Sequence, residues 1–465
     1  MSHITFYGAA GTVTGSRHLI SIREKKDHDI LLDCGLFQGR KKLRRMNWQE
    51  EGLLEEKIDA VFLSHAHIDH SGFLPRLVKF GYDGPIVCTG VTREISEILL
   101  RDSAHLHEED AKYAQKMNYS KHDPPLPLYD GEDAQQTNQL FKEWRYNKPY
   151  TRLEGVDVRF LDAGHILGSS FIELTIQREK GPFRLLYTGD FGKYEKLDLM
   201  PDPTPVDHAD LLVLESTYGN REHPREDPSE AISECIKRIQ RNQSTLIIPA
   251  FAVERAQEIL FILRKLEQAG KLPRHVPVYL DSPLSVKATE IFNRHKRNLS
   301  DYFKRFNTLF PKNTHFVRSV KESKKLNGMP GPLILISASG MLEGGRILHH
   351  LKYRLSNPLN VILFVGFQAS GTRGDRMLNG EETVKIHGRH YPVKLRIEQI
   401  MSMSSHGDYN DMMRWLRNFK RLPERICLVH GEEDALNRLK QHLVDTFNYK
   451  DEQIFIPEIG DTLDF

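Results

Sequence analysis

Cysteine is scarce in this sequence, and long apolar runs are missing. Only Cys34, Cys88, Cys235 and Cys427 occur among 465 residues, and no two of them form a Cys-X-X-Cys pair, which excludes a zinc knuckle and a disulfide framework. No stretch approaches the roughly 18 apolar residues that a membrane span needs. Residues 1–5 lack the charged start and apolar core of a signal peptide. These absences predict a cytoplasmic protein in a reducing compartment that does not span a membrane.

An excess of charge of one sign is also lacking. The chain has 65 basic and 63 acidic residues and a net charge of +2. The overall charge therefore neither favours nor opposes a nucleic-acid partner, so any attraction to phosphate must come from a local patch. One basic cluster, Arg40-Lys41-Lys42 with Arg44-Arg45, is expected to be a solvated loop or helix face.

The length predicts two or three domains, and the apolar pattern predicts an α/β fold. Short β-branched runs, each followed by a turn, are typical of buried strands. Helical patterns at 229–241 and 256–268 lie between them. Residues 104–150, with Pro124-Pro125-Leu126-Pro127 and many charges, are expected to form an exposed helical insertion or lid. The strands are expected at 30–32, 60–63, 184–187, 211–214, 246–248, 278–280, 333–336, 361–365 and 426–429.

Polar residues follow several of these runs directly. In α/β folds the loops at the carboxyl ends of strands carry ligand-binding groups. Asp33, His65, Asp190, Glu215 and His430 occupy such positions here.

The strongest local pattern is a cluster of metal-ligand types directly after the strand at 60–63. His65, His67, Asp69 and His70 fall within six residues. Imidazole and carboxylate are the ligands of catalytic zinc sites, where one position stays open for water. A tight turn can direct alternate side chains at two ions about 3.5–4 Å apart, which together hold a phosphoryl group. The sequence therefore predicts a metal site here.

Three further residues are candidate ligands. His165 lies in a glycine-flanked turn, Asp190 follows Thr188-Gly189, and His430 precedes Gly431. From the residues alone, each is as well explained by an ordinary hydrogen-bonded or surface side chain.

Taken in order, these residues resemble the motifs of the metallo-β-lactamase fold, namely Asp33, His65-X-His67-X-Asp69-His70, His165 and Asp190. The segments 215–219, 405–408 and 430–432 resemble the additional motifs of the β-CASP branch, which includes messenger-RNA 3′-end-processing nucleases and ribonuclease J. The resemblance spans essentially the whole chain. It implies an α/β architecture, an αββα sandwich formed by residues 1–216 and 399–465, with an α/β β-CASP domain inserted at 217–398.

The resemblance also implies a ligand set for two zinc ions per chain. His65, His67 and His165 would hold one ion, Asp69, His70 and His430 the other, and Asp190 would bridge them. Glu215 and His406 would form a pair beside the metals.

Two glycine- and serine-rich segments, 337–346 and 368–374, resemble the family as well. Backbone N–H groups in such loops after strands can bind phosphate. Without the resemblance, tight turns that cap helices are the simpler interpretation. The residues expected to bind phosphate or RNA are Ser337, Ser339, Gly340, Ser370, Gly371 and Thr372.

The chain departs from the family pattern at two points. Ser405 stands where a small apolar residue usually precedes the motif histidine. The short segment after His430 is not expected to hold an appended RNA-binding domain. RNA affinity would then come from the core or from an oligomer such as a homodimer.

The sequence therefore predicts a zinc-dependent ribonuclease acting in RNA processing or degradation. A metal-bound hydroxide, oriented by Asp69 or Asp190, would attack phosphorus. His406, oriented by Glu215, would protonate the leaving oxygen, with RNA in a cleft between the domains. Endonuclease and 5′-exonuclease modes both fit, as does single-stranded DNA as a ligand. The alternatives are a metallo-hydrolase of DNA, a small phosphodiester or a thioester, and an inactive β-CASP scaffold.

Overall fold

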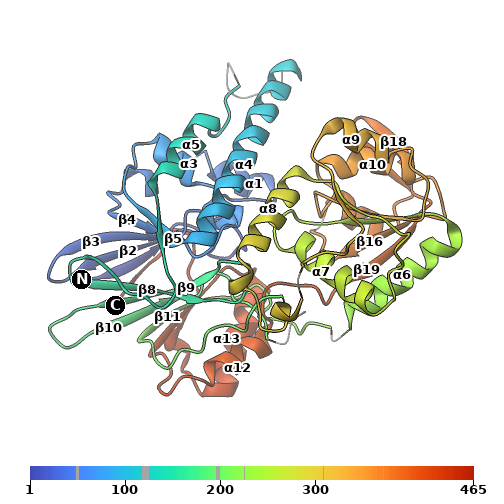
Figure 1. Ribbon diagram of the computed structural model, residues 1–465. Coiled ribbons are helices and arrows are strands. Elements are labelled where there is room, and N and C mark those ends of the chain that lie inside the picture. The colour runs from blue at the N-terminus through green and yellow to red at the C-terminus, as the bar shows by residue number, and fades with distance from the viewer. Residues whose placement is uncertain (49–51, 118–124, 195–198, 225, 307, 370) are drawn as a thin grey trace. The chain divides into compact units, whose positions relative to one another are not determined.

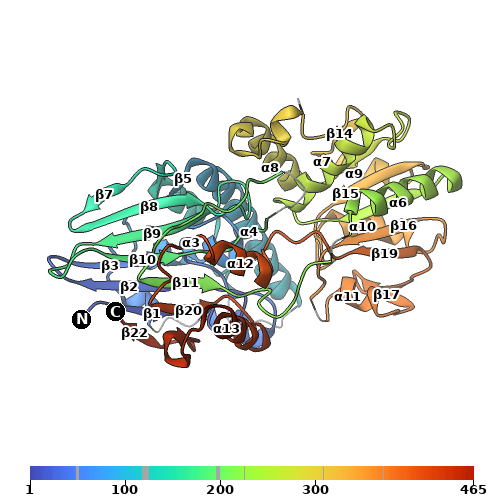
Figure 2. The same cartoon turned by 90° about the horizontal axis from the view of Figure 1, so that it is seen from below.

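A computed structural model describes residues 1–48, 52–117, 125–194, 199–224, 226–306, 308–369 and 371–465 (Figures 1 and 2). Contacts within the chain divide these residues into two compact units. The first contains the described residues of 1–194, 200–222 and 405–465, and the second contains Leu199 and the described residues of 223–404. The exact bounds predicted for the inserted domain, residues 217 and 398, stay a prediction.

The first unit contains two seven-stranded sheets of mixed direction. The first has the order β22 (Thr462–Asp464), β1 (His3–Phe6), β2 (His18–Arg23), β3 (Asp27–Leu32), β4 (Ala60–Phe62), β5 (Ile86–Thr89) and β6 (Phe141–Trp144). The second has the order β21 (Ile454–Phe455), β20 (Arg425–Val429), β11 (Leu211–Glu215), β10 (Phe183–Tyr187), β9 (Ser170–Ile176), β8 (Val156–Asp162) and β7 (Tyr150–Leu153).

Alternating apolar residues make the two sheets pack face to face. On β3, Ile30 and Leu32 belong to the core between the sheets, whereas Leu31 packs on the opposite face. On β10, Leu185 joins the same inner core and Leu186 joins the outer one. Figure 1 shows helices outside both sheets: α3 (Leu74–Lys79), α4 (Gly90–Met117) and α5 (Gly131–Leu140) on one side, α12 (Tyr409–Leu416) and α13 (Glu433–Phe447) on the other. This is the predicted αββα sandwich.

The described part of residues 104–150 is largely helical, as predicted, but its end belongs to the first sheet rather than to an insertion or lid. Residues up to 117 continue the long helix α4, and α5 packs against α3 and α4. Phe141–Trp144 forms β6, which pairs in parallel with β5. The strand was missed because it lies at an edge of the sheet, where only Phe141 is buried and the apolar run is short. Residues 118–124 lie outside the described residues.

The basic cluster lies on the short helix α1 (Lys41–Met46), as predicted for a solvated face. None of its residues is buried. Two other short helices of this unit are α2 (Ile68–Ser71) and the 3-10 helix η1 (Leu53–Glu55), and η4 (Asp451–Gln453) precedes β21.

The second unit is a doubly wound α/β fold around one sheet, all of whose strands are parallel. The strand order is β14 (Thr314–Phe316), β13 (Val278–Leu280), β15 (Leu333–Ser337), β12 (Thr245–Pro249), β16 (Val361–Val365) and β19 (Arg396–Ile400). A small hairpin joins β17 (Thr383–Ile386) to β18 (Arg389–Pro392). The helices are α6 (Pro228–Asn242), α7 (Arg255–Gln268), α8 (Pro283–Arg294), η2 (Lys296–Asn298), η3 (Phe303–Arg305), α9 (Val320–Leu326), α10 (Arg346–Arg354) and α11 (Arg373–Leu378).

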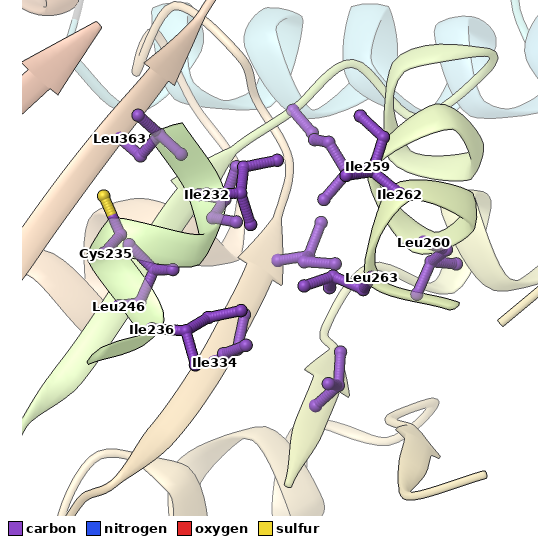
Figure 3. Packing of buried hydrophobic residues seen from close by; sticks show 14 of the residues in the cluster. Ile232, Cys235, Ile236, Leu246, Ile259, Leu260, Ile262, Leu263, Ile334 and Leu363 are labelled. Carbon is purple, nitrogen blue, oxygen red and sulfur yellow. The ribbon is translucent and has the colours of Figure 1, made fainter. Parts of the chain in front are cut away.

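The spacing of apolar residues explains why α6 packs on this sheet. Ile232, Ile236 and Ile239 recur every three or four residues and therefore share one face of the helix. Figure 3 shows Ile232 and Ile236 packing with Leu246 of β12. Burying each such side chain stabilises the fold by about 1.5–3 kcal/mol. All strands and both helices predicted from the sequence are present within three residues of their expected bounds.

No helix in the described part of the chain has both the length and the apolar character needed to cross a lipid bilayer.

Candidate metal centre

The His-X-His-X-Asp-His segment forms a tight turn between β4 and α2. Leu63 and Ser64 continue from β4, and His67 is the N-terminal cap of α2. Backbone hydrogen bonds fasten the turn to the loop after β3: Cys34 N–H donates to the oxygen of His70, and Leu36 N–H to that of Ile68. The ligand-type side chains are therefore held by two neighbouring strand ends.

Three more candidate ligands reach the same place from the second sheet. Asp190 follows β10, and His430 follows β20. β10, β11 and β20 run parallel, so their carboxyl ends lie at one edge of the sheet. His165 follows β8, which, like β10, is antiparallel to β9 and therefore ends at the same edge. The structure thus brings together all seven residues predicted as ligands, His65, His67, Asp69, His70, His165, Asp190 and His430.

The first group of ligand atoms has the spacing of a tetrahedral site. His67 Nδ1 lies 3.1 Å from His65 Nε2 and 3.3 Å from His165 Nε2. Asp190 Oδ2 lies 3.4 Å from His65 Nε2 and 3.3 Å from His165 Nε2. Four ligands about 2.0–2.1 Å from a tetrahedral zinc ion are separated from each other by about 3.3–3.4 Å. These four atoms can hold one ion.

The second group lies on the other side of Asp190. His70 Nε2 is 3.2 Å from His430 Nε2, and His430 Nε2 is 3.6 Å from Asp69 Oδ2. Asp190 Oδ1 is 3.0 Å from His70 Nε2, whereas its other oxygen, Oδ2, faces the first group. Asp190 is therefore placed to bridge two ions.

The chemistry of this set fits metal ions better than protons. Imidazole nitrogens face one another in both groups. If the proton of one nitrogen lies between the two rings, it is not available to the neighbouring carboxylate oxygen, which then lacks a donor. Asp190 Oδ1 is buried and accepts no hydrogen bond. A shared cation satisfies all of these lone pairs at once, because His and Asp are ligands that zinc accepts.

Asp33 fixes the orientation of His70. Its Oδ2 accepts hydrogen bonds from His70 Nδ1, Ser64 Oγ and Tyr187 Oη, each at 2.7 Å. Because the Ser64 hydroxyl donates to Asp33, its oxygen is free to accept from His65 Nδ1 at 3.0 Å. Both histidines are thereby held with Nε2 directed at the candidate metal centre. Hydrogen-bond partners of metal-ligating histidines usually orient the ring in this way.

The two histidines contributed by more distant parts of the chain are oriented similarly. His165 Nδ1 donates to the carbonyl oxygen of Ser405 at 3.2 Å, and His430 Nδ1 lies 3.1 Å from Thr217 Oγ1. Ser405, at which the chain departs from the family pattern, therefore contacts His165 through its backbone oxygen. The identity of the Ser405 side chain matters little for this contact.

Two residues of the centre have unusual backbone angles. Asp33 has φ 59° and His430 has φ 50°, the left-handed region that non-glycine residues seldom occupy. Such strain, of order 1–3 kcal/mol each, is found mostly where a functional side chain is needed at that point. Here Asp33 is the hydrogen-bond partner of one candidate ligand, His70, and His430 is itself a candidate ligand.

Burial favours the neutral form of His65, His67 and His165, and the surrounding histidines favour the ionised form of Asp190. Burial lowers the pKa of His67 to about 3 and also lowers the pKa of His65 and His165. Burial alone would raise the pKa of Asp190, but the surrounding histidines lower it well below its usual value. Neutral imidazole and ionised carboxylate are the forms that bind metal.

Glu215 and His406 form a pair at the edge of the centre. His406 Nδ1 lies 3.0 Å from Glu215 Oε1, and His406 Nε2 lies 3.9 Å from Asp190 Oδ2. Glu215 is held in place because Phe191 N–H donates to its Oε1 and Thr217 N–H to its Oε2. Burial lowers the pKa of His406, but the Glu215 and Asp190 carboxylates outweigh it and raise that pKa to about 9. The His406 side chain remains 21% exposed.

The residues predicted to bind phosphate lie in the second unit, where their polar groups have partners within the fold. Ser337 Oγ donates to the oxygen of Asp281 at 2.8 Å, and Ser339 Oγ accepts Glu343 N–H at 3.0 Å. Gly340 follows β15 and is buried.

The second predicted phosphate segment begins α11. Thr372 Oγ1 caps this helix by accepting Asp375 N–H, and Gly371 N–H donates to the Asp375 carboxylate at 2.8 Å. Ser370 lies outside the described residues. The assignment of all six residues to phosphate binding stays a prediction.

The sequence analysis missed the roles of Ser64 and Thr217. Each adjoins a motif residue, but serine and threonine occur beside strands too often for their spacing to indicate hydrogen bonding to a ligand. Only the conformation of the turn brings their hydroxyl groups to the histidine rings.

Comparisons with known proteins agree with this geometry. Family models match the metallo-β-lactamase superfamily over 18–227, the β-CASP domain over 256–377 and the Zn-dependent metallo-hydrolase RNA specificity domain over 390–457. Ribonuclease TTHA0252 of Thermus thermophilus is 35% identical over 436 residues, which cover 92% of this chain and 93% of that protein. An RNase J-like protein of Methanocaldococcus jannaschii is 32% identical, over 87% of each chain.

Two further matches are more distant. The transcription termination factor FttA of Methanocaldococcus jannaschii is 30% identical over 92% of this chain and 67% of that protein. A crystal structure of an Enterococcus faecalis protein of unknown function has a TM-score of 0.55 at 13% identity over 99% of both chains, a likeness that concerns the fold alone. Given the extent of the first matches, the chain belongs to the β-CASP family of metallo-hydrolases with the metallo-β-lactamase fold.

Proposed function

We propose that this protein is a ribonuclease that hydrolyses RNA phosphodiester bonds with two bound zinc ions. The observation that carries the proposal is the Glu215–His406 pair beside the bridging Asp190. A metal cluster alone would serve many hydrolases, whereas a histidine held at its edge supplies the proton that a leaving alkoxide needs. The relatives named as ribonucleases support RNA as the substrate.

The metal-ligand residues divide into two sets under this proposal. His65, His67, His165 and Asp190 would hold one zinc ion, and Asp69, His70 and His430 would hold the other, with Asp190 beside both groups. When bound, such ions supply an activated water and positive charge beside the phosphate oxygens.

The chain itself would position and move protons. The carboxylates of Asp69 and Asp190 accept a hydrogen bond from the attacking water and so orient it towards phosphorus. His406, as an imidazolium, keeps one proton on Nδ1 for Glu215 and presents the other on Nε2 to the leaving oxygen. Glu215, fixed by two backbone N–H groups, holds the ring in this orientation and acts as a positioning residue.

The test is to remove the proton donor while keeping the ligands. His406→Ala is expected to retain two zinc ions per chain and to lose about 10²–10⁴-fold in cleavage rate. Cleavage would be followed on 5′- and 3′-labelled RNA with and without a chelator, and the product ladder separates endonuclease from 5′-exonuclease action. Parallel assays with single-stranded DNA, bis-nitrophenyl phosphate and a thioester test the other substrate classes.

His208 offers a matched control in the same unit. It pairs with Asp210 at 3.2 Å and its side chain is 28% exposed, close to the values for His406. His208→Ala should cleave RNA at the wild-type rate. If His406→Ala also cleaves at that rate, the proposed proton donor is wrong, and if the wild-type protein binds no metal, an inactive scaffold is the better description.

A further inference from the structure

Two exposed phenylalanines lie at one edge of the sheet of the second unit. Phe251 is 47% exposed and Phe367 is 50% exposed, and in the described part of the chain only Phe80 is a third exposed phenylalanine. They follow β12 and β16, which are neighbouring parallel strands. Both rings therefore lie just beyond the carboxyl ends of adjacent strands, the edge at which α/β folds bind ligands.

Gly340 joins the two segments. A Cβ atom at Gly340 would lie 3.2 Å from the nitrogen of Phe251 and 3.3 Å from its ring. Gln368 Nε2 donates to the carbonyl oxygens of Gly340 and Phe367, each at 3.2 Å. Phe251 lies directly against Gly340, whose lack of a side chain allows the ring to approach closely. Gln368, the neighbour of Phe367, is hydrogen-bonded to the same glycine.

The loop that carries Phe251 is held in a strained conformation. Glu254 has φ 69° and ψ −65°, and Arg255 N–H donates to the oxygen of Val253 at 3.0 Å. These are the features of a classic γ-turn, which is rare because it is strained. Ala256 N–H donates to the oxygen of Phe251 at 3.2 Å, which fixes the start of the loop. The fold tolerates a strained turn beside an exposed aromatic ring, a combination expected at binding sites.

We infer that Phe251 and Phe367 form a stacking surface for unpaired bases of single-stranded RNA. This inference rests on the proposed function and adds to it a preference for the structure of the substrate. Aromatic rings stack on any base, because every base offers a π face, and such contacts bind single strands with little sequence preference. The bases of a duplex are already stacked on one another and do not reach such rings.

The surroundings favour bases over a protein partner. In the described loops that carry Phe251, Gly340 and Phe367, the other exposed residues are Glu343, Gly345 and Gly371. A protein interface core is a contiguous apolar patch, whereas two exposed rings among a carboxylate and glycines suit separate bases of one strand.

The experiment compares ring removal with ring replacement in the full-length, zinc-loaded protein. Binding of a fluorescent oligouridylate of about 12 nucleotides is measured by anisotropy in the His406→Ala background, so that the probe is not cut. We expect F251A/F367A to raise Kd at least about 10-fold, since one stacked base contributes about 5- to 150-fold. F251W/F367W should restore Kd to within about 3-fold, and F251L/F367L should not, because leucine keeps apolar area without a π face.

Tyr353 of α10 provides the control. It is 64% exposed in the same unit, and Tyr353→Ala should leave Kd unchanged. Binding of a duplex of the same length, the melting temperature and hydrolysis of bis-nitrophenyl phosphate by the variants with His406 intact should also be unchanged.

Several outcomes would overturn the inference: an unchanged Kd for F251A/F367A, equal loss of duplex binding, rescue by leucine, or a change of oligomeric state that shows the rings packed against a second copy. The proposed function is judged separately. If the wild-type protein cuts no RNA but ring removal weakens oligouridylate binding, the stacking surface stands alone. If RNA is cut normally and ring removal changes nothing, only the stacking surface fails.

Discussion

Histidine and aspartate gather in buried clusters in both units, but the two clusters differ in which atoms face each other. In the first unit ring nitrogens face ring nitrogens, as His70 Nε2 faces His430 Nε2 at 3.2 Å. In the second unit each nitrogen of His350 faces an oxygen: Nε2 lies 2.6 Å from Asp281 Oδ2 and Nδ1 lies 2.9 Å from Asn327 Oδ1. Protons satisfy the second arrangement, whereas the first, in which His70 Nε2 also lies 3.0 Å from Asp190 Oδ1, could hold a cation.

The central aspartates show the same contrast. Asp281 Oδ1 accepts from Arg346 at 2.7 Å, and its Oδ2 accepts from His350 and from Ser323 Oγ at 2.5 Å. Asp190 Oδ1 is buried and accepts no hydrogen bond. Residue composition alone therefore does not make a metal site. The direction of the lone pairs decides whether a cluster can bind a metal ion. The first cluster could accept an ion, whereas in the second cluster hydrogen-bond donors of the protein already satisfy the Asp281 oxygens.

The largest effect is expected from Asp190→Ala. Loss of the bridging carboxylate removes a ligand from both groups, so we expect less than one zinc ion per chain. Cleavage should fall at least about 10³-fold, because metal stabilisation of the transition state contributes several kcal/mol. Metal content by mass spectrometry and RNA cleavage are the measurements. Asp281→Ala should keep both zinc ions, and equal zinc loss in the two variants would contradict the distinction between the clusters.

Asp281→Ala should instead weaken the fold of the second unit. It leaves Arg346 and His350 without their carboxylate, and breaking a buried charge pair costs about 3–5 kcal/mol. The three tryptophans, Trp48, Trp144 and Trp415, all belong to the first unit. Tryptophan fluorescence therefore does not report on the second unit. Hydrogen exchange of peptides from β13 and β15 is the suitable measurement.

Asp301 gives the matched control for this stability effect. Its side chain is 95% exposed and pairs with Lys304 at 2.7 Å in the same unit. Asp301→Ala should leave the exchange rates unchanged, because an exposed pair adds little. Equal protection in wild type and Asp281→Ala would show that the closed network is not a source of stability.

The contrast between the clusters also shows what the sequence could predict. His65, His67, Asp69 and His70 are adjacent in the chain, so the residue types and the strand before them were enough. Asp190 and His430 were placed by strand ends, but only the family resemblance separated them from ordinary polar residues. The strand β6 was missed because one buried residue, Phe141, leaves almost no pattern.

Hydrogen-bond partners were beyond sequence reasoning for a physical reason. Asp281 and His350 are 69 residues apart, and nothing in either segment indicates that the two meet. Ser64 and Thr217 act through single hydroxyl groups whose direction depends on the turn. Packing fixes such contacts at a scale of about 3 Å, whereas periodicity in the sequence specifies only faces of helices and strands.

Asp33→Asn should have an intermediate effect on the metal centre. Asparagine keeps the shape and tolerates the φ of 59° at this position, but it removes the charge that orients His70. Replacing such an outer partner weakens metal binding by about 10–100-fold. Competition with a zinc chelator measures the loss. Asp29→Asn on β3, the strand before Asp33, should change the affinity little, because Asp29 pairs with Arg23. Equal affinities for all three proteins would remove the role of Asp33.

The smallest effect is a pH dependence confined to the closed cluster. Burial alone would raise the pKa of Asp281, but hydrogen bonds from His350, Ser323 and Arg346 outweigh burial and lower it. A carboxyl group with a lowered pKa in the folded protein stabilises the fold fully above its unfolded pKa of about 3.9, and this contribution is lost as pH falls from there through the folded value. The side chain in Asp281→Asn does not titrate, so the stability gap between wild type and Asp281→Asn should be smaller at about pH 3.5 than at about pH 5. Hydrogen exchange in β13 at the two pH values, corrected for intrinsic rates, measures the gap. A gap that stays constant would mean that the Asp281 carboxyl group does not change its proton affinity on folding.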